Sequence, residues 1–299
     1  LSKSDVRGFN TGTEAGRELI VSLVLPDTMT EIPDGRRQTP IFVGFTSLKT
    51  VKAAGLVTLG EYGFYNCASL TSISLPKAVS LGNYVFYGCT SLASVTIPEA
   101  VTIGNYALYG CTSLASATLP KAVTIGAYAL ADCTGLISVT MPEAVTLGMG
   151  PFFNCTSLTT ANLPKVESLL GINAFYNCTS LATVSLPEAV TISNTVFSGC
   201  TSLTTVILPK AGSIGQGAFF NCTSLATVTL GTIPPTIGTG IFSGAATTGK
   251  IITIKTPQLA LYNLVTPWSD KMGTSSNWGT YWDNNTNTKD NLTVALAAL

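Results

Sequence analysis

The sequence of 299 residues contains no histidine and few charged side chains, with 15 basic and 15 acidic residues that give no net charge. Without histidine there is no Ser-His-Asp or Cys-His nucleophile, and the commonest general base and metal ligand are missing. A neutral chain has no electrostatic basis for binding nucleic acid or an anionic membrane. No apolar run approaches the roughly 18 residues of a membrane span. We therefore expect no enzyme of these classes, no nucleic-acid partner and no transmembrane segment.

What the chain does contain is a repeat. Eight cysteines share one register of a 22-residue repeat, with a single 23-residue step. They are Cys67, Cys89, Cys111, Cys133, Cys155, Cys178, Cys200 and Cys222. Phe45 lies one repeat before the first of them and is followed by the same Thr-Ser-Leu. The period predicts a solenoid of about ten stacked coils.

Each unit has two parts. A Leu-x-x-Val-x-Leu strand turns alternate side chains inward and ends at a proline, which cannot donate to a continuing ladder. A short apolar piece, a glycine and an aromatic side chain then close the coil. The aromatic positions are Phe64, Phe86, Phe152, Phe175, Phe197 and Phe219. One unit cannot bury its own apolar face, so stacking must supply the core.

These patterns predict a repeat solenoid, mainly β with short helical or irregular turns. We divide it into an N-terminal extension (1–18), an N-terminal capping repeat (19–44), the solenoid proper (45–245) and a C-terminal cap and tail (246–299). A last strand is expected at 251–255, beyond which the pattern dissolves.

The motif Leu-x-x-Ile-x-Leu-Pro followed by Ile-Gly-x-x-Ala-Phe-x-x-Cys resembles the BspA-like (Treponema pallidum type) leucine-rich repeat of bacterial surface proteins, over residues 19–257. The resemblance implies a right-handed superhelix, export and adhesion to proteins or glycans of a host or neighbouring cell. It implies no catalytic residue and no cofactor. Residues 256–271 resemble a capping tail with a short helix ahead of Trp268. The sequence begins at Leu1 without a leader, so we expect that an export signal, with or without a lipid anchor, has been removed.

The cysteines of an exported chain suggest disulfides. Because identical positions in adjacent coils point the same way, we instead expect an inward ladder of free, buried thiols. Pairing of neighbours stays open, since the Cα spacing lies within disulfide range.

Alternating charges follow the prolines. They are Lys77, Glu99, Lys121, Glu143, Lys165, Glu188 and Lys210. Each lysine should lie between glutamates of neighbouring coils, which predicts a surface ion-pair ladder that sets the register. A catalytic carboxylate pair has one candidate here, Glu99 with Glu143, at about 10 Å. The intervening lysine favours the ionised carboxylate, whereas a general acid must be protonated.

The outward strand positions are almost all hydroxyl-bearing. They include Ser72 and Ser74, Ser94 and Thr96, Ser116 and Thr118, Ser138 and Thr140, Thr183 and Ser185, and Thr227 and Thr229. Solvation of a flat sheet explains this composition. A ligand-facing surface and an ice-binding array are the alternatives.

Tyrosines recur in two registers. One holds Tyr62, Tyr84, Tyr106 and Tyr128, and the other, three positions on, holds Tyr65, Tyr87 and Tyr109; Tyr176 follows further along. Tyrosine offers a large contact area with a polar tip, so these seven residues are the candidate ligand-binding site. Aromatic stacking that only shields the turn is the alternative.

Three functions follow from these features. The first is an exported, non-enzymatic binding scaffold. The second is a structural spacer or surface-layer element without a ligand, and the third is a carbohydrate-active or ice-binding protein. The sequence does not determine the oligomeric state.

Overall fold

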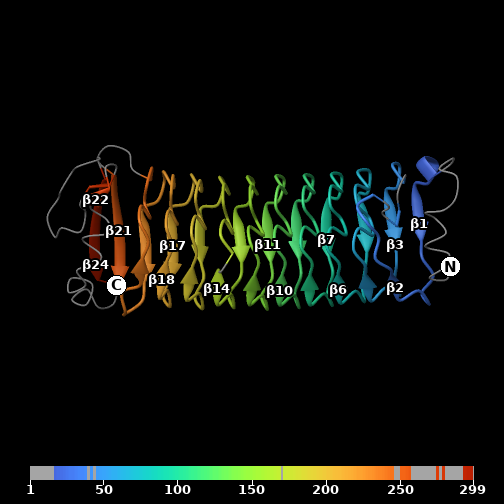
Figure 1. Cartoon of the computed structure of the whole chain (residues 1–299), viewed down its shortest axis with the longest axis horizontal. Coiled ribbons are helices and arrows are strands. Elements are labelled where there is room, and N and C mark those ends of the chain that lie inside the picture. Colours follow the sequence, from blue (N-terminus) through green and yellow to red (C-terminus); the bar gives the residue numbers. More distant parts are fainter. Residues whose placement is uncertain are drawn as a thin grey trace.

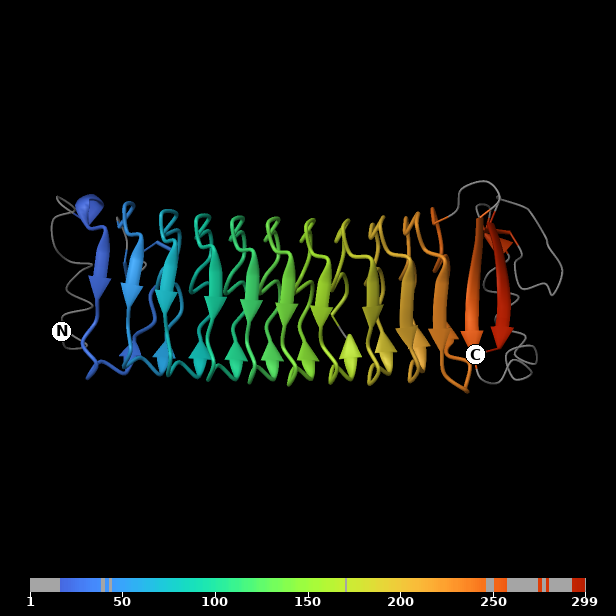
Figure 2. The same ribbon diagram turned by 180° about the vertical axis from the view of Figure 1, so that it is seen from behind.

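The computed structural model describes residues 17–38, 41–42, 45–169, 171–245, 250–256, 274–275, 278–279 and 292–298. These residues form a rod of stacked coils that runs from the N-terminal strand β1 at one end to β21 and β24 at the other (Figure 1). The reverse view shows the same stack of coils from behind (Figure 2). The predicted mainly β solenoid is confirmed.

Each regular coil contributes one longer strand and one two-residue strand. The longer strands are β1 (Ser22–Val24), β3 (Thr50–Lys52), β5 (Ser72–Ser74), β7 (Ser94–Thr96), β9 (Ser116–Thr118), β11 (Ser138–Thr140), β13 (Thr160–Asn162), β15 (Thr183–Ser185), β17 (Thr205–Leu208), β19 (Thr227–Leu230), β21 (Lys250–Thr256) and β24 (Leu292–Ala298). The short strands are β2 (Glu31–Ile32), β4 (Thr58–Leu59), β6 (Ser80–Leu81), β8 (Thr102–Ile103), β10 (Thr124–Ile125), β12 (Thr146–Leu147), β14 (Ser168–Leu169), β16 (Thr191–Ile192), β18 (Ser213–Ile214) and β20 (Thr236–Ile237). A 3-10 helix, η1 (Arg17–Leu19), precedes β1, and β22 (Thr274–Ser275) pairs antiparallel with β23 (Trp278–Gly279).

Parallel pairing joins equivalent residues of successive coils. Ser116 pairs with Ser138, and Thr124 with Thr146, in each case with the same position of the next repeat. The short strands form one ten-stranded sheet from β2 to β20. Nine turns of the solenoid connect these ten strands. This number is close to the ten coils expected from the sequence.

The sheet of longer strands is not continuous. It is divided into β1–β3–β5, then β7 to β13, then β15 to β24. The second break coincides with the 23-residue step of the repeat, which adds one residue between β13 and β15. The outward serines and threonines are exposed or half-buried, as predicted.

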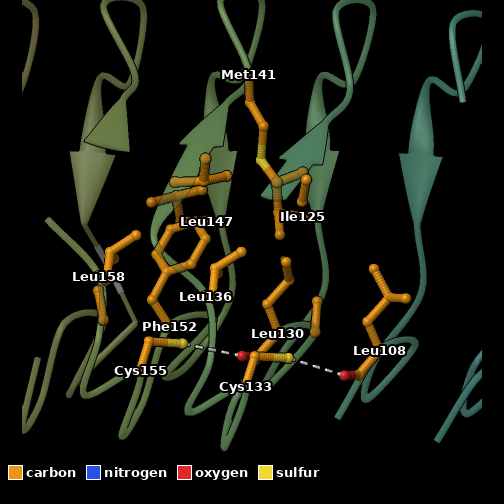
Figure 3. Close-up of a cluster of buried hydrophobic side chains, with 14 of the residues drawn as sticks. Leu108, Ile125, Leu130, Cys133, Leu136, Met141, Leu147, Phe152, Cys155 and Leu158 are labelled. Carbon is orange, nitrogen blue, oxygen red and sulfur yellow. Dashed lines mark hydrogen bonds between the residues drawn. The ribbon is translucent and has the colours of Figure 1, made fainter. Parts of the chain in front are cut away.

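The core is a set of side-chain ladders. The predicted aromatic residues are all fully buried, and so are the repeated leucines Leu70, Leu92 and Leu114. The phenylalanines stack on one another in ring pairs such as Phe175 and Phe197, whose centroids lie 5.5 Å apart. Leu108 and Leu130 take the aromatic position in the two coils between Phe86 and Phe152 (Figure 3).

All eight cysteines are free and buried, as expected. From the second cysteine on, each Sγ donates a hydrogen bond to the backbone carbonyl of the buried residue that closes the preceding coil. Cys133 bonds the oxygen of Leu108, and Cys155 that of Leu130, both at 3.1 Å (Figure 3). Burial raises the pKa of the Cys67 thiol to about 12, which keeps that thiol protonated. Cysteine is thus a small donor that fills the core and satisfies a buried carbonyl.

The charged row forms separate pairs and not the continuous ladder that we predicted. Lys121 contacts Glu99 at 2.7 Å, Lys165 contacts Glu143 at 2.6 Å, and Lys210 contacts Glu188 at 2.5 Å. Each of these lysines therefore joins the glutamate of the preceding coil. A lysine ammonium that lies at hydrogen-bond distance from one carboxylate is too far from the glutamate of the other neighbouring coil. Each of these lysines therefore has a single partner among the residues that the structure describes. The pairs are exposed and worth about 0.2–1 kcal/mol each.

The C-terminal strand of the sheet was not predicted. The strand expected at 251–255 is present as β21, and β24 pairs with it in parallel from Lys250 with Leu292 to Thr256 with Ala298. The expected helix before Trp268 and residues 1–16 of the extension lie outside the described residues. The proposed domain boundaries stay predictions. In the part of the chain that the structure describes, no helix has the length and apolar character needed to cross a bilayer.

Candidate ligand-binding site, the tyrosine stripe

The seven predicted tyrosines lie together on the turns that close the coils, and we call them the tyrosine stripe. Within a coil, the backbone N–H of Tyr87 donates to the carbonyl of Tyr84 at 3.2 Å, and Tyr109 donates to Tyr106 in the same way. This β-turn brings the two tyrosines of a coil onto one side, while the phenylalanine or leucine between them points into the core. The sequence spacing of three thus becomes two adjacent rows.

Rings of successive coils stack. In the first row the centroid distances are 4.8 Å for Tyr62 and Tyr84, 4.9 Å for Tyr84 and Tyr106, and 5.2 Å for Tyr106 and Tyr128. In the second row they are 5.0 Å for Tyr65 and Tyr87, and 4.9 Å for Tyr87 and Tyr109. Across the rows the rings lie 5.5–5.9 Å apart. These contacts bring every predicted site residue into one array. All seven residues are partly exposed.

Stacking decides which part of each ring meets solvent. Tyr84, Tyr106 and Tyr87 have a tyrosine against both faces. The outer face of Tyr128 is closed by Gly150, where an added Cβ would lie 2.7 Å from ring carbon Cε1. These four rings therefore present edges and hydroxyl groups, and not open faces. Edges and hydroxyls suit edge-to-face contacts and hydrogen bonds.

The first row has an unusual backbone. Its four tyrosines have positive φ, 55° at Tyr62, 58° at Tyr84, 55° at Tyr106 and 54° at Tyr128. This left-handed conformation costs an L residue with a bulky side chain roughly 1–2 kcal/mol, and glycine or asparagine is the usual occupant. In later coils the same register holds Gly150, Asn173, Thr195, Gly217 and Gly240, also at positive φ.

A second left-handed position in each coil, directly before the cysteine, shows what the backbone prefers. It is always glycine, asparagine or aspartate: Asn66, Gly88, Gly110, Asp132, Asn154, Asn177, Gly199, Asn221 and, in the last coil, Gly244. Tyrosine in the first row is thus retained against the local preference of the chain. This strain was not predicted, although glycine and asparagine at the same register of later coils signal it.

Hydrogen bonds to neighbouring coils impose the strained conformation. The N–H of Tyr84 donates to the carbonyl of Asn105 at 2.9 Å. Just before the tyrosines, Asn83 Oδ1 accepts from the N–H of Asn105, and Asn105 Oδ1 accepts from that of Ala127, both at 2.7 Å. The tyrosine backbone is therefore held by the stack, which pre-organises the rings.

The hydroxyl groups of Tyr84, Tyr106 and Tyr109 stay neutral. Desolvation raises the pKa of Tyr84 and of Tyr106, and neighbouring tyrosines raise it further. A hydrogen bond to the Asp132 carboxylate is the main cause that raises the pKa of Tyr109. Asp132 also accepts from Asn154 Nδ2 at 2.7 Å. The stripe is accordingly an uncharged surface of hydrogen-bonding phenols.

The array ends beyond Tyr128. Phe153 meets Tyr128 edge-on at 6.2 Å and stacks on Tyr176 at 4.9 Å. Tyr176, which the sequence places further along, therefore has a phenylalanine neighbour and lies outside the stripe. The described residues contain no group of three or more histidine, cysteine, aspartate or glutamate side chains that could hold a metal.

A groove of about 380 Å³ lies in the other half of the rod, across β16, β18 and β20. Polar residues, among them Thr191, Asn194 and Ser213, line it together with apolar residues such as Ile172. The sequence did not indicate this groove. It is a second place on the described surface where a ligand could be held.

Several solved structures of bacterial leucine-rich repeat proteins are similar to this chain. Among solved structures, a T. pallidum leucine-rich repeat protein is 28% identical over 51% of this chain and 76% of its own, with a TM-score of 0.47. A leucine-rich cell surface protein of Faecalibacterium prausnitzii is 19% identical over 79% of this chain and 77% of its own, with a TM-score of 0.50. A leucine-rich repeat protein of Bacteroides ovatus is 18% identical over 93% and 83%, with a TM-score of 0.49.

A search among curated protein sequences finds no match. The family model described as the BspA type leucine-rich repeat region matches residues 17–137 and 123–248, which is most of the chain. Those residues carry the coils and the tyrosine stripe. The chain belongs to the BspA type leucine-rich repeat family.

Proposed function

We propose that the chain is an exported bacterial scaffold, at the cell surface or secreted, that binds a protein or glycan of a host or neighbouring cell through the tyrosine stripe and catalyses no reaction. One observation carries this proposal. Tyr62, Tyr84, Tyr106 and Tyr128 occupy backbone positions that favour glycine or asparagine. Strain that a structure keeps at clustered surface positions is typical of functional sites.

Rigidity and composition support the same proposal. Each ring has few torsions and is fixed by its stacked neighbours, so little side-chain entropy is lost on binding. The stripe is wide enough for two rows of contacts and carries no net charge, which suits a surface that buries aromatic edges. The solved structure of F. prausnitzii with this fold is described as a cell surface protein.

The test compares the wild-type rod with a stripe variant on arrays of matrix proteins and glycans. The stripe variant carries Tyr84→Asn, Tyr106→Asn and Tyr128→Asn, because asparagine tolerates positive φ and keeps the turn. Val79, Val101 and Val123 lie at a different register of the same region and are 40%, 39% and 38% exposed. Changing these three valines to serine gives a control with the same number of substitutions.

Saturable binding that the stripe variant loses and the valine variant keeps would support the proposal. Binding retained by the stripe variant would refute the role of the tyrosines and direct attention to the groove beside Thr191. Absence of binding on every array would favour the spacer function. Thermal unfolding of all three proteins checks that the fold is intact.

A further inference from the structure

The second row of the stripe places phenol groups side by side in a way that ligand binding does not require. Tyr87 stacks on Tyr109 at 4.9 Å with 5° between the ring planes, and on Tyr65 at 5.0 Å with 16°. Neighbouring coils repeat by a translation of about 4.8 Å. Equivalent carbons of stacked rings, including those ortho to the hydroxyls, therefore lie opposite one another at a partly exposed surface.

Asp132 distinguishes this row. Its carboxylate accepts a hydrogen bond from the Tyr109 hydroxyl and another from Asn154 Nδ2. A phenol that loses one electron becomes a strong acid and gives up its proton at once. A carboxylate already bonded to the hydroxyl is placed to take that proton, so Tyr109 is the ring of this pair that is prepared for oxidation.

The other easily oxidised groups of these coils are shielded. Cys89 and Cys111 are fully buried, and each thiol donates to a backbone carbonyl. Burial raises the pKa of both thiols well above the ordinary value, which removes the reactive thiolate. In these two coils an oxidant in solution therefore meets the phenols before the thiols.

We propose that the stripe is a site of oxidative cross-linking, at which Tyr87 and Tyr109 become joined by a carbon–carbon bond between their ortho carbons. The reagent is an external one-electron oxidant, such as the ferryl haem of a peroxidase. It removes one electron from each ring. The Tyr109 proton passes to Asp132 and the Tyr87 proton to water.

The two phenoxyl radicals then couple. Each coupled ortho carbon releases its hydrogen, which returns to the phenol oxygen of its ring. The product is a biphenol, and the net change is the loss of two electrons and two protons. Because the rings are already adjacent, coupling within the chain is favoured over coupling between chains by effective concentration. The new bond closes a loop from Tyr87 to Tyr109 and staples two coils, as a disulfide would.

The experiment uses the full chain with photo-oxidised tris(bipyridyl)ruthenium and persulfate. Dityrosine fluorescence, gel mobility and mass spectrometry of proteolytic peptides are followed. We expect a monomer lighter by two hydrogen atoms, with the Tyr87 and Tyr109 peptides joined. Tyr109→Phe keeps the stacked ring without a phenol, and should lower the yield of this cross-link at least tenfold.

Tyr176 supplies the matched control, because its stacked neighbour is Phe153 and Tyr176→Phe should leave the yield unchanged. Asp132→Asn removes the proton acceptor and should slow coupling severalfold without changing the link. Products joined only between chains, or a yield equal to that of the urea-unfolded chain, would overturn the proposal. An unchanged rate in Asp132→Asn would overturn the role of the carboxylate.

Discussion

The coils from Tyr62 to Tyr128 and the coils from Gly150 to Gly240 share one backbone and differ in what occupies its left-handed turn. In both halves φ at this register lies between 51° and 64°. The later coils fill it mainly with glycine and asparagine, and their one threonine, Thr195, donates to Asn173 Oδ1 at 2.5 Å. The earlier coils fill it with stacked tyrosines.

The difference separates the needs of the fold from the needs of the surface. Since the later coils form the same turn without aromatic residues, the turn does not require tyrosine. Stacking returns about 0.5–1.5 kcal/mol per ring pair, which offsets much of the backbone cost of roughly 1–2 kcal/mol. The stripe is therefore stable only as a row, because an isolated tyrosine would bear the strain without the stacking.

The largest effect is expected from removing a buried phenylalanine, which tests whether the two halves share one core. Phe86 and Phe197 are both fully buried, one in each half. Replacing either with alanine should lower the free energy of unfolding by about 3–5 kcal/mol, because a large cavity is left. Urea unfolding followed by circular dichroism measures this. Phe220→Ala is the control, since Phe220 is 42% exposed and should matter little. A large loss in only one half would break the comparison.

A reciprocal exchange tests the row argument directly. Asn173→Tyr should lower the free energy of unfolding by about 2 kcal/mol. The new tyrosine would adopt positive φ without a stacked tyrosine beside it, and the hydrogen bond from Thr195 would be lost. Tyr106→Asn should change stability by less than about 1 kcal/mol, because relief of strain offsets lost stacking. Thermal unfolding of both variants gives the result.

Tyr106→Ala completes that series. Alanine loses the ring yet keeps most of the backbone strain, so it should be less stable than Tyr106→Asn by roughly 0.5–1 kcal/mol. If Tyr106→Asn proved as costly as Asn173→Tyr, the claim that strain is stored in the first half would be wrong.

The smallest effect is the alkaline pH dependence that the tyrosines add to that of the buried thiols, whose raised pKa values, as at Cys89 and Cys178, act in both halves. The folded-state pKa values of Tyr84, Tyr106 and Tyr109 are raised above the unfolded value of about 10. The neutral phenols thus contribute stability that is fully present below about pH 10 and is lost as pH rises through the folded pKa. The melting temperature should therefore fall as the pH is raised from neutral into the alkaline range.

The variant with Tyr84→Phe, Tyr106→Phe and Tyr109→Phe keeps the rings and removes the ionisable groups. Its melting temperature should fall less steeply over the same alkaline range. An identical pH profile for both proteins would show that the hydroxyls of the stripe do not carry this dependence.

Much of the architecture could be predicted because a solenoid repeats one local solution. The regular spacing of the cysteines identified the coils, and identical positions in parallel coils point the same way, so the buried thiols and the buried Phe64 and Phe197 follow from spacing alone. The seven tyrosines were grouped by the same reasoning. β24 was not found, since it begins at Leu292, far beyond the end of β21 at Thr256 and outside the period.

The sequence by itself determined the period, the core and the registers of the tyrosines, because each depends on residue type repeated at fixed spacing. Only the tertiary structure decided that Tyr62, Tyr84, Tyr106 and Tyr128 adopt positive φ, and that Tyr84, Tyr106 and Tyr128 expose ring edges rather than faces. It also decided which glutamate each paired lysine contacts. These outcomes depend on hydrogen bonds and contacts between coils, and a strained backbone or a chosen partner exists only once neighbouring coils hold it in place.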